Sequence, residues 1–146
     1  MEKIASFQKD HDKLQPGLYA QTDKNQITTF DLRFKKPNSG DYITPKALHT
    51  IEHLLATVLR NSEKKDDIVY FGPMGCRTGF YLLTLRLSFE EVLALLKESI
   101  KKALALEEVP GSKREECGNY LEHDLAAAKE ELTNYLLILD GVEAHS

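Results

Sequence analysis

Alternation of apolar and polar side chains predicts extended structure in three segments of the chain. Residues 26–34 place one set of side chains on a common face, namely Thr28, Phe30, Leu32 and Phe34. A period of two is typical of a strand with one buried face. Residues 68–71 form a short apolar run that Gly72-Pro73 stops, and residues 79–87 form a longer one. Both runs are predicted strands. In the second strand, one face carries Tyr81, Leu83, Leu85 and Leu87.

The segment that follows the first strand has the start signal and the spacing of a helix. Thr44 precedes Pro45, and a threonine cap followed by proline at the first helical position is a typical helix start. Apolar side chains then recur every three or four residues: Leu48, Ile51, Leu55, Val58 and Leu59. Asn61 is expected to end this helix.

Two more helices are expected in the second half of the chain. Ser88 and Glu91 have the spacing of a capping box, which predicts a helix to about residue 106. A last helix is expected over residues 122–139. Strands and helices are interspersed without the regular rhythm of a parallel sheet, so we predict an α+β fold in which helices cover one face of an antiparallel sheet. Without an internal repeat or a convincing linker, residues 1–146 are expected to form a single domain.

Composition and charge narrow the possible partners of the chain. The 146 residues are 42% hydrophobic and 29% charged, as in an ordinary globular protein. The net charge of -4 argues against nucleic acid as the main partner, because binding to phosphates needs an excess of lysine and arginine. Neither a membrane-spanning apolar run nor an apolar leader segment is present in the sequence, so a cytoplasmic location is expected and a membrane partner is not. The two cysteines favour a metal-binding or catalytic role over a disulfide framework.

A pair of histidines in the first predicted helix indicates a metal site. His49 and His53 are four residues apart, so they lie one above the other on the helix and can reach the same ion. They lie away from the apolar stripe centred near Ile51 and Leu55, and they are therefore not simply core residues. Glu52 lies in the same turn, close enough to transfer a proton near the ion. The alternative is a solvated pair of histidines on an exposed helix face.

A metal ion held by two imidazoles needs at least one further protein ligand, with one position left open if the site is catalytic. Cys117 is the best candidate, because a thiolate is a strong ligand for zinc or ferrous iron and Gly118 lets the backbone approach closely. Glu122 and His123 are competing third ligands.

The second cysteine, Cys76, lies in a glycine-rich turn between two predicted strands. Glycines on both sides allow a tight turn that presents the thiol to a cleft. A nearby divalent ion and Arg77 would favour its thiolate form. The alternative is a small buried side chain without a chemical role.

These motifs together resemble the LuxS family of S-ribosylhomocysteine lyases, and the resemblance covers nearly the whole chain. The matching segments occur in the family's order: Ser6-Phe7 with Asp10-His11, Asp31-Leu32-Arg33 with Pro37-Asn38, residues 49–53, residues 73–79 and residues 116–119. One departure stands out, since many members have an aspartate six residues before the cysteine of the glycine-rich turn, where this chain has Tyr70.

The resemblance implies a function and a role for each candidate residue. The implied reaction is cleavage of S-ribosylhomocysteine to L-homocysteine and 4,5-dihydroxy-2,3-pentanedione, the precursor of the quorum-sensing signal autoinducer-2, as a step of the methyl cycle. The implied cofactor is one divalent ion per subunit, Fe²⁺ natively and often Zn²⁺ or Co²⁺ as isolated, bound by His49, His53 and Cys117. The implied acid/base pair is Cys76 and Glu52. The implied substrate contacts come from the neighbouring subunit of a homodimer with active sites at its interface: Ser6, His11 and Arg33.

Two other classes of function share part of this pattern. His-x-x-Glu-His also occurs in inverted zincin peptidases, but such enzymes are larger and have no use for a cysteine framed by glycines. A small metal-binding or signalling domain with a structural ion is the other alternative. Structural zinc sites usually have four protein ligands, so a fourth ligand would favour that alternative and an open position favours catalysis.

Overall fold

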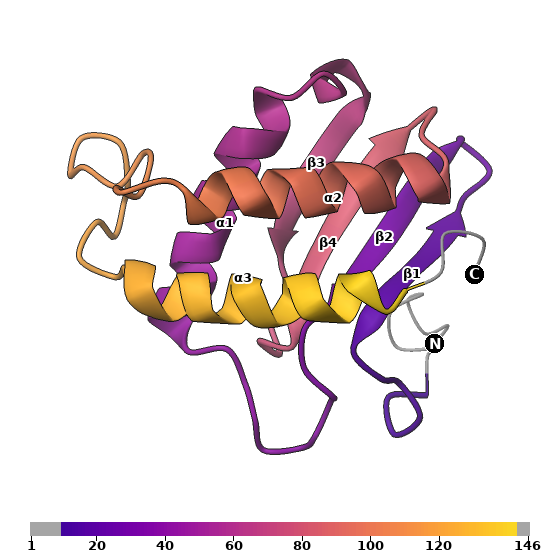
Figure 1. Ribbon diagram of the computed structural model, residues 1–146, viewed down its shortest axis with the longest axis horizontal. Helices are drawn as coiled ribbons and strands as arrows, with labels where there is room; N and C mark the ends of the chain where they lie inside the picture. The colour runs from indigo at the N-terminus through magenta and orange to yellow at the C-terminus, as the bar shows by residue number, and fades with distance from the viewer. Residues whose placement is uncertain (1–9, 143–146) are drawn as a thin grey trace, which may run out of the picture.

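The computed structural model describes residues 10–142, which form a four-stranded sheet and three long helices (Figure 1). In chain order the elements are β1 (Gly17–Thr22), β2 (Ile27–Arg33), α1 (Pro45–Arg60), the short 3-10 helix η2 (Lys65–Asp67), β3 (Ile68–Pro73), β4 (Gly79–Leu85), α2 (Phe89–Leu104) and α3 (Leu125–Asp140).

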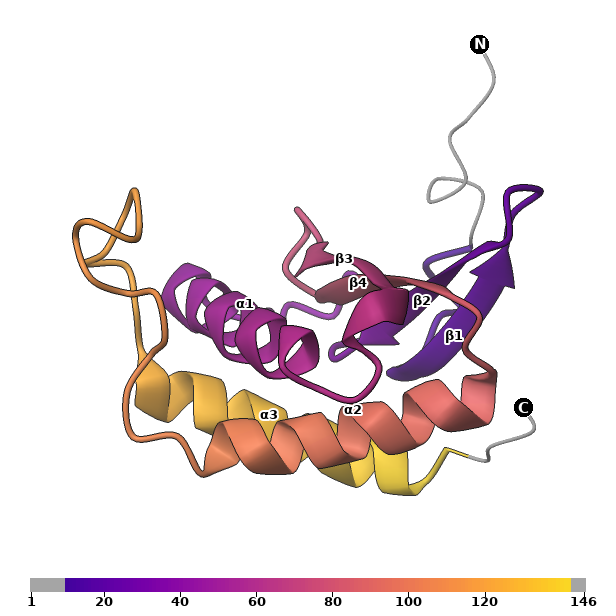
Figure 2. The same ribbon diagram turned by 90° about the horizontal axis from the view of Figure 1, so that it is seen from above.

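The strands are all antiparallel and follow the order β1-β2-β4-β3 across the sheet. The helices lie on one side of this sheet, with α2 and α3 side by side beneath it and α1 next to β3 (Figure 2). Phe30 on β2 pairs with Leu82 on β4, and both side chains are buried in the core that the helices cover. The predicted α+β architecture, an antiparallel sheet with helices on one face, is therefore confirmed.

Local capping signals account for the helix boundaries. The Thr44 hydroxyl accepts a hydrogen bond from the Ala47 amide at 3.3 Å, and the Ser88 hydroxyl accepts one from the Glu91 amide at 3.1 Å. The Glu91 carboxylate in turn accepts from the Ser88 amide, which completes the predicted capping box. Helix α3 begins at Leu125, later than expected, because the carboxylate of Asp124 caps it by accepting from the Ala127 amide at 3.0 Å.

Strand β1 was not predicted from the sequence, because it lacks the alternation of a half-buried strand. Only its first two residues, Gly17 and Leu18, are buried, and the remaining four are exposed. The hairpin to β2 is instead held by a turn in which the Asp23 carboxylate accepts hydrogen bonds from the Asn25 and Ile27 amides. Local turn chemistry and pairing with β2 therefore place this edge strand.

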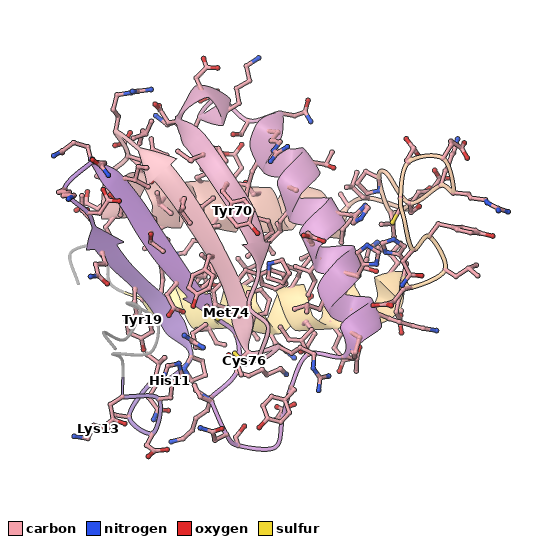
Figure 3. The ribbon with its side chains drawn as sticks, turned by 180° about the vertical axis from the view of Figure 1, so that it is seen from behind. His11, Lys13, Tyr19, Tyr70, Met74 and Cys76 are labelled. Carbon is pink, nitrogen blue, oxygen red and sulfur yellow. The ribbon has the colours of Figure 1, made fainter. Side chains whose placement is uncertain are left out.

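The other face of the sheet is not covered by a helix in the part of the chain that the structure describes (Figure 3). Tyr19 and Tyr70 are exposed on it, and β2 adds Thr29 and the buried ion pair of Asp31 and Arg33 to the same face. Tyr81, Leu83 and Leu85 of β4 share this face and are half-buried, whereas the neighbouring Phe80 and Leu82 lie in the core. None of the described helices is long and apolar enough to span a bilayer.

Gly79, the first residue of β4, allows this strand to pass close to β2. A Cβ atom at this position would overlap the backbone carbonyl group of Leu32, which cannot move without breaking the pairing of the two strands. We expect Gly79→Ala to lower the free energy of unfolding by about 3 kcal/mol, as overpacking of a rigid site does. Gly75→Ala is the matched control, because its Cβ would meet no atom within 4 Å. Equal urea unfolding midpoints for the two variants would contradict this prediction.

Candidate active site

The two histidines of α1 meet two residues of the long loop between α2 and α3. His49 and His53 approach each other with their Nε2 atoms 3.1 Å apart. The Cys117 sulfur lies 3.5 Å from Nε2 of His49 and 3.8 Å from Nε2 of His53. His123 joins them, and the possible ligand atoms of the four residues all lie within 4.8 Å of one another. Helix α1 and the loop (Figures 1 and 3) thus gather the residues that the sequence predicted as ligands.

Backbone carbonyl groups fix the tautomers of both α1 histidines. Nδ1 of His49 lies 2.8 Å from the carbonyl oxygen of Glu122, and Nδ1 of His53 lies 2.9 Å from that of Pro110. A carbonyl oxygen can only accept, so each Nδ1 carries the proton and each Nε2 presents a lone pair to the cluster. Two lone pairs that face each other at 3.1 Å repel unless a cation lies between them.

The cluster fits a single divalent metal ion. In a tetrahedral zinc site with about 2.0–2.1 Å to nitrogen and about 2.3 Å to sulfur, the ligand atoms are roughly 3.3–3.6 Å apart. The separations among His49, His53 and Cys117 span 3.1–3.8 Å. Imidazole nitrogen and thiolate sulfur are also donors that zinc and ferrous iron accept. These residues can therefore hold one metal ion.

The two competing ligands, Glu122 and His123, have different places in the structure. Glu122 contributes its backbone carbonyl to His49, and its carboxylate accepts a hydrogen bond from the Asn119 side chain at 2.7 Å. His123 belongs to the cluster: its Nε2 lies 3.9 Å from the Cys117 sulfur, and its ring stacks on that of His49 at 4.1 Å. Burial, and then the neighbouring His49 and His53, lower the pKa of His123 below its ordinary value.

Cys76 lies in a separate cavity, in the turn that joins the end of β3 to the start of β4. The cavity has a volume of about 530 Å³, and His11, Arg33 and Cys76 all line it. Figure 3 shows His11 and Cys76 together at this end of the sheet. Among the described residues 10–142, those that line this cavity do not include Glu52 or any member of the metal cluster. The structure thus groups the predicted residues into two sets, and Ser6 lies outside the described residues.

A chain of hydrogen bonds connects Cys76 to a buried ion pair. Arg33 donates through Nη1 to the Thr78 hydroxyl at 2.7 Å, and that hydroxyl lies 3.0 Å from the Cys76 sulfur. The other side of the guanidinium donates twice to the Asp31 carboxylate, at 2.7 and 3.1 Å. Because the Thr78 oxygen accepts from Arg33, its own proton can be donated to the Cys76 sulfur at 3.0 Å or to the Met74 sulfur at 3.9 Å, and the cysteine is the nearer of the two. Sequence reasoning did not identify Asp31 or Thr78 as functional residues. Asp31 pairs with Arg33 two positions away on β2, and Thr78 meets Arg33 across 45 positions of sequence.

Other predicted residues near the two sets have less direct contacts. Arg77, expected to favour the Cys76 thiolate, donates to the Ile43 carbonyl and lies over the Tyr42 ring. Glu52 is half-buried on α1 and forms no hydrogen bond or ion pair with the described residues. Tyr70, at the position where the family often has aspartate, lies exposed on the helix-free face next to Gly72.

Comparison with known proteins gives one family. The family profile described as S-Ribosylhomocysteinase (LuxS) matches residues 4–143 of the chain. A protein named S-ribosylhomocysteine lyase from Borreliella afzelii (strain PKo) is 46% identical over 150 residues, covering 98% of this chain and 96% of its own. Relatives with the same name from Phocaeicola vulgatus (46% identical; 93% of this chain, 89% of its own) and Desulfotalea psychrophila (45% identical; 97% and 94%) are similar over comparable lengths. The chain therefore belongs to the S-ribosylhomocysteinase (LuxS) family.

Proposed function

We propose that this chain is a metal-dependent carbon–sulfur lyase that cleaves S-ribosylhomocysteine to L-homocysteine and 4,5-dihydroxy-2,3-pentanedione, the autoinducer-2 precursor. Family membership supports this reaction, and the names of its relatives specify the substrate. The observation that supports it best is the cage of His49, His53 and Cys117, whose two imidazole tautomers present lone pairs to a common point.

The chemistry of the substrate explains why proton carriers and a metal ion are both needed. The thioether at C5 of the ribose cannot leave directly, because no adjacent group stabilises a carbanion. Movement of the carbonyl from C1 to C2 and then to C3 makes the C4 proton acidic, after which the sulfur leaves by β-elimination. When bound, the metal ion supplies a Lewis acid that polarises the sugar oxygens.

Two residues of the chain are assigned to the proton transfers. Cys76 is exposed in its cavity and hydrogen-bonded to Thr78, so its sulfur is both accessible and oriented. Glu52 follows Ile51 on α1 beside the ligand His53, and its carboxylate is not engaged by another described residue. A base and an acid on opposite sides of the sugar can move a proton between neighbouring carbons. Ser6, His11 and Arg33 are assigned to substrate binding, and the last two line the cavity of Cys76.

Three further assignments concern the metal ion, the cellular compartment and the domain organisation. We assign Fe²⁺ as the native metal ion, as the family resemblance implies, and two imidazoles with one thiolate would also accept Zn²⁺ or Co²⁺. A ferrous site and two free cysteines fit a reducing compartment, which supports a cytoplasmic location. The sheet and the three helices share one hydrophobic core, which supports a single domain over residues 1–146.

A homodimer explains why one chain holds the proposed catalytic residues in two places. Cys76 lies with Arg33 and His11 in one cavity, whereas Glu52 and the metal ligands lie on α1 and the loop that follows α2. If the neighbouring subunit supplies His11 and Arg33, it must also supply Cys76, because Thr78 links Cys76 to Arg33. The helix-free face of the sheet, with its exposed tyrosines and half-buried leucines, offers an apolar surface for such an interface.

Mixed dimers test the reaction and the shared active site together. Cys76→Ala and Glu52→Gln proteins are each expected to release almost no homocysteine from S-ribosylhomocysteine. After subunit exchange, about a quarter of the sites should be intact, because random pairing makes half of the two-fold dimers mixed and each mixed dimer has one complete site. A thiol reagent detects the released homocysteine. An inactive wild-type protein would contradict the proposed reaction, and a mixture without recovery would contradict the shared site.

A further inference from the structure

His123 decides whether the metal cluster has an open position. Its Nε2 lies 3.9 Å from the Cys117 sulfur, within reach of the same cluster as His49 and His53. A fourth protein ligand would close the coordination sphere, as in structural zinc sites. A histidine whose Nε2 carries a proton cannot be that ligand, so the tautomer of His123 settles its role.

The contacts of Thr50 determine this tautomer. Thr50 is fully buried on α1, and its hydroxyl oxygen accepts a hydrogen bond from the Asp124 amide at 2.9 Å. The same oxygen lies 3.0 Å from Nδ1 of His123. Within residues 10–142, this nitrogen is the one acceptor available to the hydroxyl proton. Leaving a buried hydroxyl without an acceptor costs about 1–3 kcal/mol, so Thr50 donates to Nδ1 of His123.

The consequence is a tautomer opposite to that of the two α1 histidines. Carbonyl oxygens place the protons of His49 and His53 on Nδ1. In His123, Nδ1 accepts from the Thr50 hydroxyl and so carries no proton, which leaves the ring proton on Nε2. We infer that His123 is a positioning residue and not a metal ligand: Thr50 holds it with Nε2–H directed at the Cys117 sulfur. The fourth position of the metal ion then stays available to the substrate.

A hydrogen bond from His123 would stabilise Cys117 as a thiolate ligand. An N–H donor to the sulfur stabilises its negative charge and fixes its direction, and stacking on His49 keeps the donor ring in place. Partners that orient metal ligands in this way typically change metal affinity or activity by about 10- to 100-fold when they are replaced. The inference depends on the metal site of the proposed function but not on its substrate.

Nitrogen-15 NMR of the zinc-loaded, histidine-labelled protein tests the tautomers directly. We expect a protonated Nε2 and an unprotonated Nδ1 for His123, and protonated Nδ1 atoms for His49 and His53. His123→Phe identifies the signals and retains an aromatic ring on His49. A protonated Nδ1 with a metal-shifted Nε2 at His123 would overturn the inference. Because no substrate is present, an inactive protein with the expected spectrum would argue against the proposed reaction alone.

Paired variants of Thr50 and a cobalt titration give an independent measure. Thr50→Val is expected to remove the tautomer preference of His123, whereas Thr50→Ser retains the hydroxyl and the spectrum. His123→Phe should still bind one Co²⁺ per chain, with affinity lowered by no more than about 100-fold, and its sulfur-to-cobalt absorption should move to lower energy. A loss of bound cobalt as large as that in Cys117→Ala would show that His123 is a ligand.

Discussion

Replacing Cys76 by alanine is expected to abolish homocysteine release while the protein keeps its metal ion. Cys76 lines the cavity with His11 and Arg33 and does not belong to the metal cluster. Its sulfur lies 3.0 Å from the Thr78 hydroxyl, where it can accept and return a proton without contact with the ion. Loss of one acid/base group typically lowers the rate by about 100- to 10,000-fold. Metal analysis and a thiol assay on the same preparation measure both quantities.

Glu52→Gln is the companion variant on the other side of the proposed site. The amide keeps the shape of the side chain on α1 but cannot exchange a proton near neutral pH. A similar loss of rate with unchanged metal content is expected. If Cys76→Ala lost its metal ion instead, the roles of the two cysteines would have to be exchanged.

Replacing Cys117 by alanine is expected to lower metal content and activity together. The Cys117 sulfur is the one thiolate of the cluster, at 3.5 and 3.8 Å from the Nε2 atoms of His49 and His53. Without it, two imidazoles remain in fixed tautomers, and they bind a divalent ion much more weakly than three ligands do. We expect the affinity to fall by more than the roughly 100-fold that marks loss of an orienting partner.

The measurement is the number of metal ions per chain after gel filtration, with Cys76→Ala as the matched cysteine control. Activity that returns in proportion to added metal would agree with the loss of a ligand. A Cys117→Ala protein with a full complement of tightly bound metal would show that the sulfur is not part of the coordination sphere.

Local signals made the helices and the histidine pair predictable. The cap at Thr44, the capping box at Ser88 and the four-residue spacing of His49 and His53 depend on neighbours within one or two helical turns. The structure confirms the helix starts at Thr44 and Ser88. Cys117 was identified by its chemistry, and the structure brings it to the histidines across 64 to 68 positions of sequence.

Contacts between distant segments explain what the sequence did not reveal. Strand β1 lacks the alternation of buried and exposed side chains that marks a strand in a sequence, and it is placed by its pairing with β2 and by the Asp23 turn. The link from Arg33 through Thr78 to Cys76 joins positions 45 residues apart, and that from Thr50 to His123 joins positions 73 apart. A hydroxyl in a sequence gives no sign of its partner, so the residues that orient the site emerge only from the folded chain.

The loop between α2 and α3, residues 105–124, is fastened to α1 by hydrogen bonds at His49, His53 and Thr50. Its carbonyl oxygens at Pro110 and Glu122 accept from His53 and His49, and Cys117 lies among the ligands. Part of the free energy of metal binding therefore orders this loop, while the sheet and helices are held by their own core. When metal is scarce, this loop would therefore open before the rest of the protein unfolds. A chelator would expose residues 105–124 to proteases while the sheet and the helices stay folded.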